Sequence, residues 1–125
     1  MNLVSGWGLH NPANVKILNP NNFEQLENII INSDKNSVLA RGLGRSYGDA
    51  AQLKNKSVFS LYAFDHIYLN KKEGFITVGS GVSIDSLLKK IIPEGFFIPV
   101  SPGTRNVTIG GAIASDVHGK NHHLN

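Results

Sequence analysis

The segment PGTRNVTIGGAIASDVHGKNHH, residues 102–123, combines turn-forming residues with a run of small ones. Pro102 and Gly103 end one element, and the small residues from Gly110 to Ser115 permit close backbone approach along a short helix. This segment is the second of two glycine segments in the chain, and the first, ARGLGRSYGDA, lies at residues 40–50. Glycines in such loops can adopt positive φ and direct backbone N–H groups at an anion. Two separated segments of this kind suit a long ligand with phosphates in its middle.

The first segment departs from the common phosphate-binding motifs. Gly42, Gly44 and Gly48 give the spacing G-x-G-x-x-x-G, no helical pattern follows them, and the Walker pattern occurs nowhere in the chain. What this loop shares with those motifs is backbone freedom, to which Arg45 adds charge and Ser46 a hydroxyl donor. Taken alone, the segment is better explained as a glycine-rich connection that holds a tight turn between two strands.

Composition bounds the class of protein. The chain has 125 residues, of which 41% are hydrophobic and 17% charged, as expected for one globular domain. The formal net charge is only +3 and the basic residues are scattered, so nucleic acid is not an expected partner. The lack of cysteine excludes disulfides, thiolate catalysis and cysteine zinc sites. The amino terminus lacks the features of a secretory signal, which predicts a cytoplasmic protein.

Periodicity predicts a mixed α/β unit over residues 22–125, preceded by an irregular lead-in at residues 1–21 with Trp7 as an anchor. We expect helices behind the caps Asn22 and Ser83, and strands at 37–40, 58–64 and 66–70. A hairpin through Gly74 is expected to join the last of these strands to residues 75–81. Because no closing element follows the second glycine segment, the chain is expected to be the front part of a longer protein.

Both glycine segments together resemble the flavin-binding half of the vanillyl-alcohol oxidase (PCMH) type of FAD enzymes. Within that superfamily the chain is most similar to the bacterial decaprenylphosphoryl-β-D-ribose oxidases, and SGWG at 5–8 and VSIDSLL at 82–88 also fit. The resemblance implies an α+β FAD-binding domain with two small subdomains that grip FAD between them. It also implies that this chain is the N-terminal part of that domain and lacks the substrate domain.

The resemblance also implies which residues bind the cofactor. Three groups of residues are implied. Residues 41–49 would form the pyrophosphate loop, a group between residues 102 and 111 would line the rest of the dinucleotide, and a group between residues 115 and 119 would approach the isoalloxazine. These residues are Arg41, Gly42, Leu43, Gly44, Arg45, Ser46, Tyr47, Gly48 and Asp49; Pro102, Gly103, Thr104, Thr108, Ile109, Gly110 and Gly111; and Ser115, Asp116, His118 and Gly119.

One position predicts how FAD is attached. Several members of the superfamily carry, after the loop glycines, a histidine that bonds covalently to the flavin methyl group. Arg45 occupies that place here and cannot form the link. We therefore expect dissociable, noncovalent FAD.

The resemblance implies that His118, Lys120 and Tyr47 take part in catalysis beside the flavin and the substrate. For Tyr47, packing of the loop is an equal alternative. His118 and His122 have the spacing of metal ligands on a helix, but Gly119 and Asn121 oppose a helix there, so no metal site is expected. Solvated polar residues at a domain edge are the other alternative for this cluster.

The function implied by the resemblance is FAD-dependent oxidation of a secondary alcohol on a sugar. In the similar enzymes the 2′-hydroxyl of a polyprenylphosphoryl ribose is oxidised by hydride transfer to flavin N5, and a nicotinamide-dependent reductase completes the epimerisation to arabinose. A polyprenyl substrate suggests peripheral attachment at the inner membrane face, and the fragment alone is expected to be inactive. The alternatives are an aldonolactone or alditol oxidase with the same flavin half, and a non-catalytic nucleotide-binding module.

Overall fold

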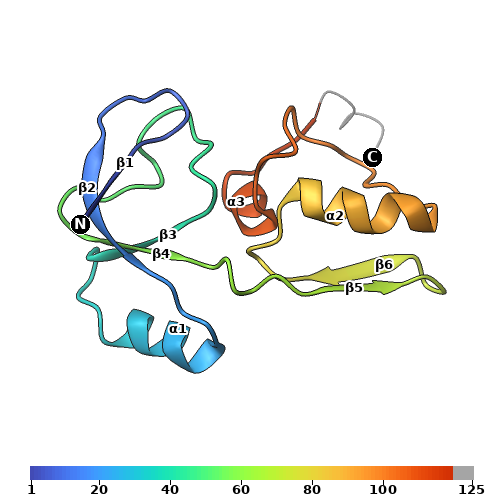
Figure 1. Cartoon of the computed structure of the whole chain (residues 1–125), viewed down its shortest axis with the longest axis horizontal. Helices are drawn as coiled ribbons and strands as arrows, with labels where there is room; N and C mark the ends of the chain where they lie inside the picture. The colour runs from blue at the N-terminus through green and yellow to red at the C-terminus, as the bar shows by residue number, and fades with distance from the viewer. Residues whose placement is uncertain (120–125) are drawn as a thin grey trace. The chain divides into compact units, whose positions relative to one another are not determined.

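The computed structural model describes residues 1–119 and divides the chain into two compact units (Figure 1). The first unit is Met1–Phe64 and the second begins at Asp65. Each unit combines strands with at least one helix and has its own cluster of buried apolar residues. The α+β class expected from the sequence is therefore confirmed.

A four-stranded sheet with the order β1-β2-β4-β3 organises the first unit. β1 (Asn2–Val4) is antiparallel to β2 (Ala13–Leu18), whereas β2, β4 (Ser57–Ser60) and β3 (Val38–Arg41) are mutually parallel. The helix α1 (Phe23–Ile31) connects β2 to β3, as a crossover between parallel strands requires. The core consists of Ala13, Val15 and Val58, against which Val4 and Ile17 pack.

The expected helix behind Asn22 is confirmed. The Asn22 side chain accepts a hydrogen bond from the backbone N–H of Gln25 at 2.9 Å, which satisfies one of the unpaired donors of the first turn. No residue of α1 is fully buried, although its sequence is rich in apolar residues. α1 thus keeps much of its apolar surface outside the core.

Two expectations for the first unit are wrong. The predicted irregular lead-in over residues 1–21 contains β1 and β2, and β2 supplies two of the three core residues, Ala13 and Val15. The strand predicted over 58–64 ends at Ser60, and Leu61 accepts a turn hydrogen bond from Phe64. The first compact unit of the structure ends at Phe64.

The second unit begins with the expected hairpin, in which β5 (Ile67–Asn70) pairs antiparallel with β6 (Phe75–Val78). Gly74 has φ +70° in the turn, a conformation that glycine adopts without strain. α2 (Ile84–Ile91) follows behind its cap Ser83 and continues into the 3₁₀ turn η1 (Ile92–Glu94). α3 (Ile109–Ala114) forms within the second glycine segment.

One face of α2 builds the core of the second unit. Val82, Leu87 and Ile91 are buried together, and apolar side chains from both hairpin strands pack against them. Figure 1 shows α2 lying along the hairpin. Within residues 1–119, no helix has the length and apolar character needed to cross a membrane.

Candidate functional site

The first glycine segment begins where β3 ends, and it has an irregular backbone from Gly42 to Asp49. Among the described residues, no partner accepts a hydrogen bond from the backbone N–H groups of residues 43–49. Gly44 has φ +65°, the left-handed conformation that lets successive N–H groups converge. The loop therefore presents a set of unused backbone donors, as an anion-binding loop requires.

Arg41 secures the loop at its base. Its Nη2 donates to the carbonyl oxygen of Ser5 at 2.6 Å, and its Nη1 donates to that of Ala51 at 2.9 Å. Partial burial lowers the pKa of the Arg41 guanidinium from its ordinary value, because desolvation disfavours the charged form. The Arg41 side chain, predicted from the resemblance to bind the cofactor, is thus directed at two backbone carbonyls that flank the loop.

Residues 5–8 contact the tip of the loop. The backbone N–H of Trp7 donates to the carbonyl oxygen of Ser46 at 2.7 Å. The Arg45 guanidinium carbon lies 5.1 Å from the centroid of the Trp7 ring, within the range of a cation–π interaction. Trp7, expected to be an anchor of the lead-in, therefore contacts both the backbone of the loop and the Arg45 side chain.

The geometry of the loop fits a phosphate group. A side chain added at Gly48 would meet no atom within 4 Å, so the space before that part of the backbone is open. Tyr47, at 83% exposure, does not pack under the loop, although packing was one of its expected roles. Open space beside unused N–H donors, with an arginine close by, matches what a pyrophosphate needs.

The second glycine segment lies antiparallel to residues 80–85. The backbone N–H of Ile84 donates to Val107 O at 2.9 Å, and that of Ile109 donates to Val82 O at 2.8 Å. A β-bridge between Ser83 and Thr108 lies between these two hydrogen bonds. The fold therefore positions residues 105–110 directly against the entry into α2.

Gly110 makes this approach possible. A Cβ atom there would lie 3.0 Å from Ser80 Cβ and 3.1 Å from Ser80 O, closer than side chains normally come to neighbouring atoms. The Gly110 N–H donates to the same Ser80 carbonyl at 3.0 Å. The glycine at this position thus serves close packing within the second unit.

The N–H groups at the start of α3 are already used by the protein. Those of Ile109 and Gly110 donate to Val82 and Ser80, and that of Gly111 donates to the capping oxygen Thr108 Oγ1 at 3.1 Å. They differ in this respect from the N–H groups of residues 43–49. This difference favours the first segment as the phosphate-binding part. Residues 108–111 could instead let a ligand approach their backbone closely.

The remaining predicted residues of the second unit lie on both sides of α3. Thr104 Oγ1 accepts a hydrogen bond from Asn106 N at 3.1 Å, and a side chain at Gly103 would meet no atom within 4 Å. After α3, Asp116 has φ +46°, and its carbonyl oxygen lies 3.2 Å from Nδ1 of the exposed His118. The other predicted positions here are the half-buried Pro102, the exposed Ser115 and the buried Gly119.

Lys120 and His122 lie outside the described residues. Over residues 1–119, no three histidine, aspartate or glutamate side chains gather closely enough to hold a metal ion. His118 is thus the one member of the predicted histidine and lysine cluster for which the structure gives an environment.

Sequence reasoning missed two segments that position the site. The first is residues 5–8, which fit the family but were expected to contribute only Trp7 as an anchor of the lead-in. The second is residues 79–81, GSG, read only as the end of a strand, although Ser80 accepts the Gly110 hydrogen bond. The glycines of SGWG and GSG were the available indications, since a glycine in an ordered segment often marks close backbone approach.

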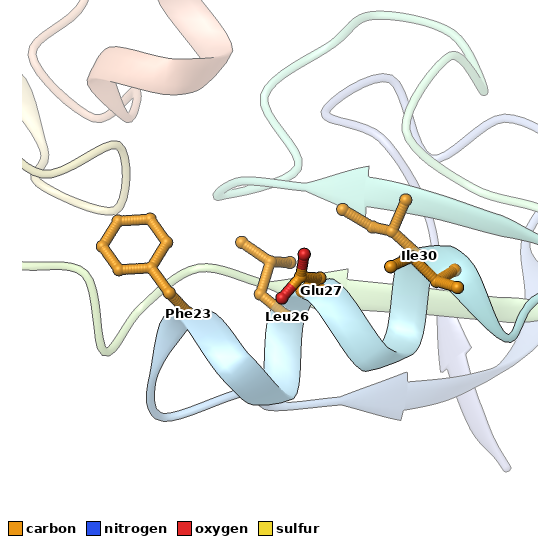
Figure 2. Close-up of a pocket in the computed structure, with 5 residues that line it drawn as sticks. Phe23, Leu26, Glu27 and Ile30 are labelled. Carbon is orange, nitrogen blue, oxygen red and sulfur yellow. The ribbon is translucent and has the colours of Figure 1, made fainter.

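The first unit also has an apolar groove along α1. Phe23, Leu26 and Ile30 project from one side of the helix (Figure 2), and the groove they line with Glu27 and Ile31 has a volume of about 520 Å³. None of these residues belongs to either glycine segment. The groove is therefore separate from the candidate site.

Comparison with known proteins identifies the family to which the chain belongs. Residues 16–125 match the family model for the FAD binding domain. The chain is 41% identical over 124 residues to the decaprenylphosphoryl-beta-D-ribose oxidase of Mycolicibacterium smegmatis. That match covers 96% of this chain but 27% of the relative, so the chain spans about a quarter of the relative's length.

Solved structures share the fold. A cholesterol oxidase from Brevibacterium sterolicum, in a histidine-to-alanine mutant form, has a TM-score of 0.76 at 19% identity and covers 94% of this chain and 24% of its own. An alkyldihydroxyacetonephosphate synthase has a TM-score of 0.64 at 18% identity, over 82% of this chain and 21% of its own. Because the family model spans most of the sequence and both glycine segments, the chain belongs to the FAD binding domain family, and FAD is its cofactor.

Proposed function

We propose that this chain is the cofactor-binding part of an FAD-dependent oxidoreductase that oxidises a secondary alcohol of a sugar. The observation that carries the proposal is the 41% identity to a decaprenylphosphoryl-beta-D-ribose oxidase over 96% of the chain. The unused backbone donors of residues 43–49 give a physical reason for cofactor binding, because they complement the charge of a pyrophosphate. The proposed substrate is a polyprenylphosphoryl ribose, oxidised at its 2′-hydroxyl.

The chain's own part begins with cofactor binding. Backbone N–H groups of residues 43–49 would donate to the pyrophosphate, and Arg45 would add positive charge while its guanidinium stays over Trp7. The second segment, through residues 102–104 and 108–111, would allow the dinucleotide to approach the backbone closely. Arg45 cannot form the covalent bond that the family's histidine forms, so the FAD is noncovalent in this proposal.

When bound, FAD supplies an acceptor for the hydride that leaves the alcohol carbon. The alcohol must also lose its hydroxyl proton, and His118 is the proposed base. Its Nδ1 lies 3.2 Å from the Asp116 carbonyl oxygen, a contact that can orient the imidazole ring. Lys120 is proposed to bind the sugar or its phosphate, and Tyr47 is proposed to lie near the flavin.

The proposed reaction has consequences for partners and location. To complete an epimerisation, the keto sugar must be reduced from the opposite face, and the proposed partner for that step is a nicotinamide-dependent reductase. A lipid-linked substrate suggests a cytoplasmic protein that works peripherally at the inner membrane face.

Substrate oxidation tests the proposal. The longest natural polypeptide that contains this chain would be loaded with FAD and mixed anaerobically with a polyprenylphosphoryl ribose, an aldonolactone or an alditol. Loss of the visible flavin absorbance with the first substrate alone supports the proposal. Bleaching only by a soluble sugar would favour the oxidase alternative, and FAD binding with no bleaching by any substrate would favour a non-catalytic module.

Acid precipitation of the loaded protein tests the mode of attachment. Noncovalent FAD predicts a yellow supernatant and a colourless pellet. Colour retained in the pellet would contradict the proposal that Arg45 replaces the covalent histidine.

A further inference from the structure

Two glycines outside the predicted site lie against the backbone of residues 43–49. Gly6 is buried, and a Cβ atom there would collide with the carbonyl oxygens of Ser46 and Gly48. A Cβ atom at Gly8 would lie 2.5 Å from the carbonyl oxygen of Tyr47. All three oxygens belong to the backbone and cannot rotate away, so neither position accepts a side chain without displacing the loop.

Residues 5–8, which we call the support segment, also hold the loop by hydrogen bonds. Trp7 N donates to Ser46 O at 2.7 Å, and Ser5 O accepts from the Arg41 guanidinium at 2.6 Å. The support segment therefore contacts the carbonyl oxygens of three successive loop residues, 46 to 48, and the arginine at the base of the loop.

These contacts determine where the loop N–H groups point. In a planar trans peptide, the carbonyl of one residue and the N–H of the next point in opposite directions. The structure contains no cis peptide bond within its described residues. Because the carbonyls of Ser46, Tyr47 and Gly48 face the support segment, the N–H groups of residues 47–49 point away from it. None of those N–H groups has a partner among the described residues.

We propose that Gly6 and Gly8 are positioning residues of the FAD site: they let the support segment lie on the loop carbonyls and so hold the N–H groups of residues 47–49 toward the pyrophosphate. The proposal rests on the proposed function, which assigns the loop to that group. Trp7 contributes to the same device by pairing with Ser46 and lying against Arg45. The first unit thus orients its phosphate donors with a segment that need not touch the cofactor.

FAD titration of Gly6→Ala and Gly8→Ala in the full chain, followed by quenching of flavin fluorescence, tests the proposal. Loss of one N–H to phosphate hydrogen bond corresponds to roughly a tenfold rise in Kd, and Gly6→Ala, which displaces two carbonyls, is expected to exceed Gly8→Ala. Gly74→Ala is the matched control, because its positive φ makes alanine strained while the new methyl group meets no atom within 4 Å. This control is expected to lower the Tm without changing the Kd.

Trypsin cleavage after Arg45 in the cofactor-free chain gives a second readout that does not depend on FAD. A displaced support segment is expected to speed this cleavage several-fold in Gly6→Ala and Gly8→Ala but not in Gly74→Ala. Circular dichroism identifies any variant that does not fold, and Gly8→Ala, which displaces a single carbonyl, then carries the test.

The outcomes separate this inference from the proposed function. Wild-type binding with an unchanged Kd in Gly6→Ala and Gly8→Ala would overturn the positioning role. Failure of the wild-type chain to bind FAD would count against the assignment of the loop, and the trypsin rates would then decide the positioning role: equal rates in wild type, Gly6→Ala and Gly8→Ala would overturn it.

Discussion

Gly44 decides the local shape of the first glycine segment. Its φ of +65° is unfavourable for residues with a side chain, and a Cβ atom there would collide with the Arg41 guanidinium. Replacement therefore strains the backbone and disturbs the arginine that fixes the base of the loop. The sequence predicted the need for glycine here but not the identity of the neighbour.

We predict that Gly44→Val lowers the free energy of unfolding by about 2 kcal/mol or more and abolishes saturable FAD binding. Thermal unfolding and FAD titration measure the two effects. Gly48→Ala is the comparison, because its methyl group meets no atom within 4 Å and its φ is not positive, so the cofactor-free fold should be retained. Equal unfolding free energies for Gly44→Val and wild type would contradict this account.

The direction of a side chain is harder to predict from sequence than the position of a loop glycine. Loop glycines follow from local backbone needs, which a short segment reveals. The direction of Arg41 depends on the carbonyls of Ser5 and Ala51, and Ser5 is brought near only by the folding of β1. A contact between residues far apart in sequence leaves no mark on the pattern around either one.

At the scale of elements, Thr108 links the second glycine segment to the start of α3. It is 8% exposed, its hydroxyl oxygen caps the helix at Gly111 N, and it forms the bridge with Ser83. We predict that Thr108→Val, which preserves shape but removes the hydroxyl, lowers the unfolding free energy by about 1–2 kcal/mol. Thr108→Ser keeps the capping hydroxyl, and its unfolding free energy should fall by clearly less than that of Thr108→Val. Chemical denaturation measures both, and equal losses would show that the cap is not the stabilising element.

The start of α2 is joined to the second glycine segment by a cluster of charges. Asp85 Oδ2 lies 2.7 Å from Lys89 Nζ and Asp85 Oδ1 lies 3.0 Å from Arg105 Nε. The hydrogen bond from Lys89, together with the charges of Lys89 and Arg105, lowers the pKa of the Asp85 carboxyl below its ordinary value of 3.8. Because the pKa of Asp85 is lower in the folded state than in the unfolded state, its ionised carboxylate stabilises the protein at pH values above the ordinary pKa. This stabilisation is lost as the pH falls through the folded-state pKa.

We therefore predict that Asp85→Asn lowers the Tm at neutral pH and that the difference from wild type disappears as the pH falls well below 3.8. Added salt should reduce the difference at neutral pH, because the partners are exposed. Lys35→Gln, at a lysine for which the structure records no ion pair among residues 1–119, serves as a charge control. A Tm difference that is constant from neutral to acidic pH would contradict the assignment.

Most elements were predictable because their periodicity and caps are local. The hairpin, α1 and α2 were expected with their caps, and Ser83 accepts from Ser86 N at 3.0 Å as predicted. β2 was not predicted because Pro12, Pro20 and several asparagines are typical of loops. These residues flank and interrupt the alternating apolar residues Ala13, Val15 and Ile17, which pack into the core. The end of β4 at Ser60 was missed because the apolar run continues into a turn whose last residue, Phe64, is buried against Phe23.

At the scale of the whole molecule, the chain has two units with separate cores. Val58 belongs to the core of the first and Leu87 to that of the second. The sequence did not predict this division, because no linker composition marks it. It arises from the topology of two small sheets, each completed within its own half of the chain.

Separate cores predict separate responses to mutation. Leu87→Ala should raise hydrogen exchange in residues 65–119 and leave the core strands β2 and β4 protected, with a local loss of about 2–4 kcal/mol. Val58→Ala should show the reverse distribution. Hydrogen exchange followed by mass spectrometry measures both, and a uniform rise over the chain in each variant would show instead that the units unfold together.

The central claim is that the unused N–H groups of residues 43–49 bind the FAD pyrophosphate. Titration of the wild-type chain with FAD, in parallel with Gly44→Val and with riboflavin, which lacks the phosphates, tests it most directly. We expect saturable FAD binding that Gly44→Val abolishes, and riboflavin binding weaker by at least about a hundredfold, since two or more charged hydrogen bonds are missing. Equal affinity for FAD and riboflavin, or FAD binding unaffected by Gly44→Val, would contradict the claim.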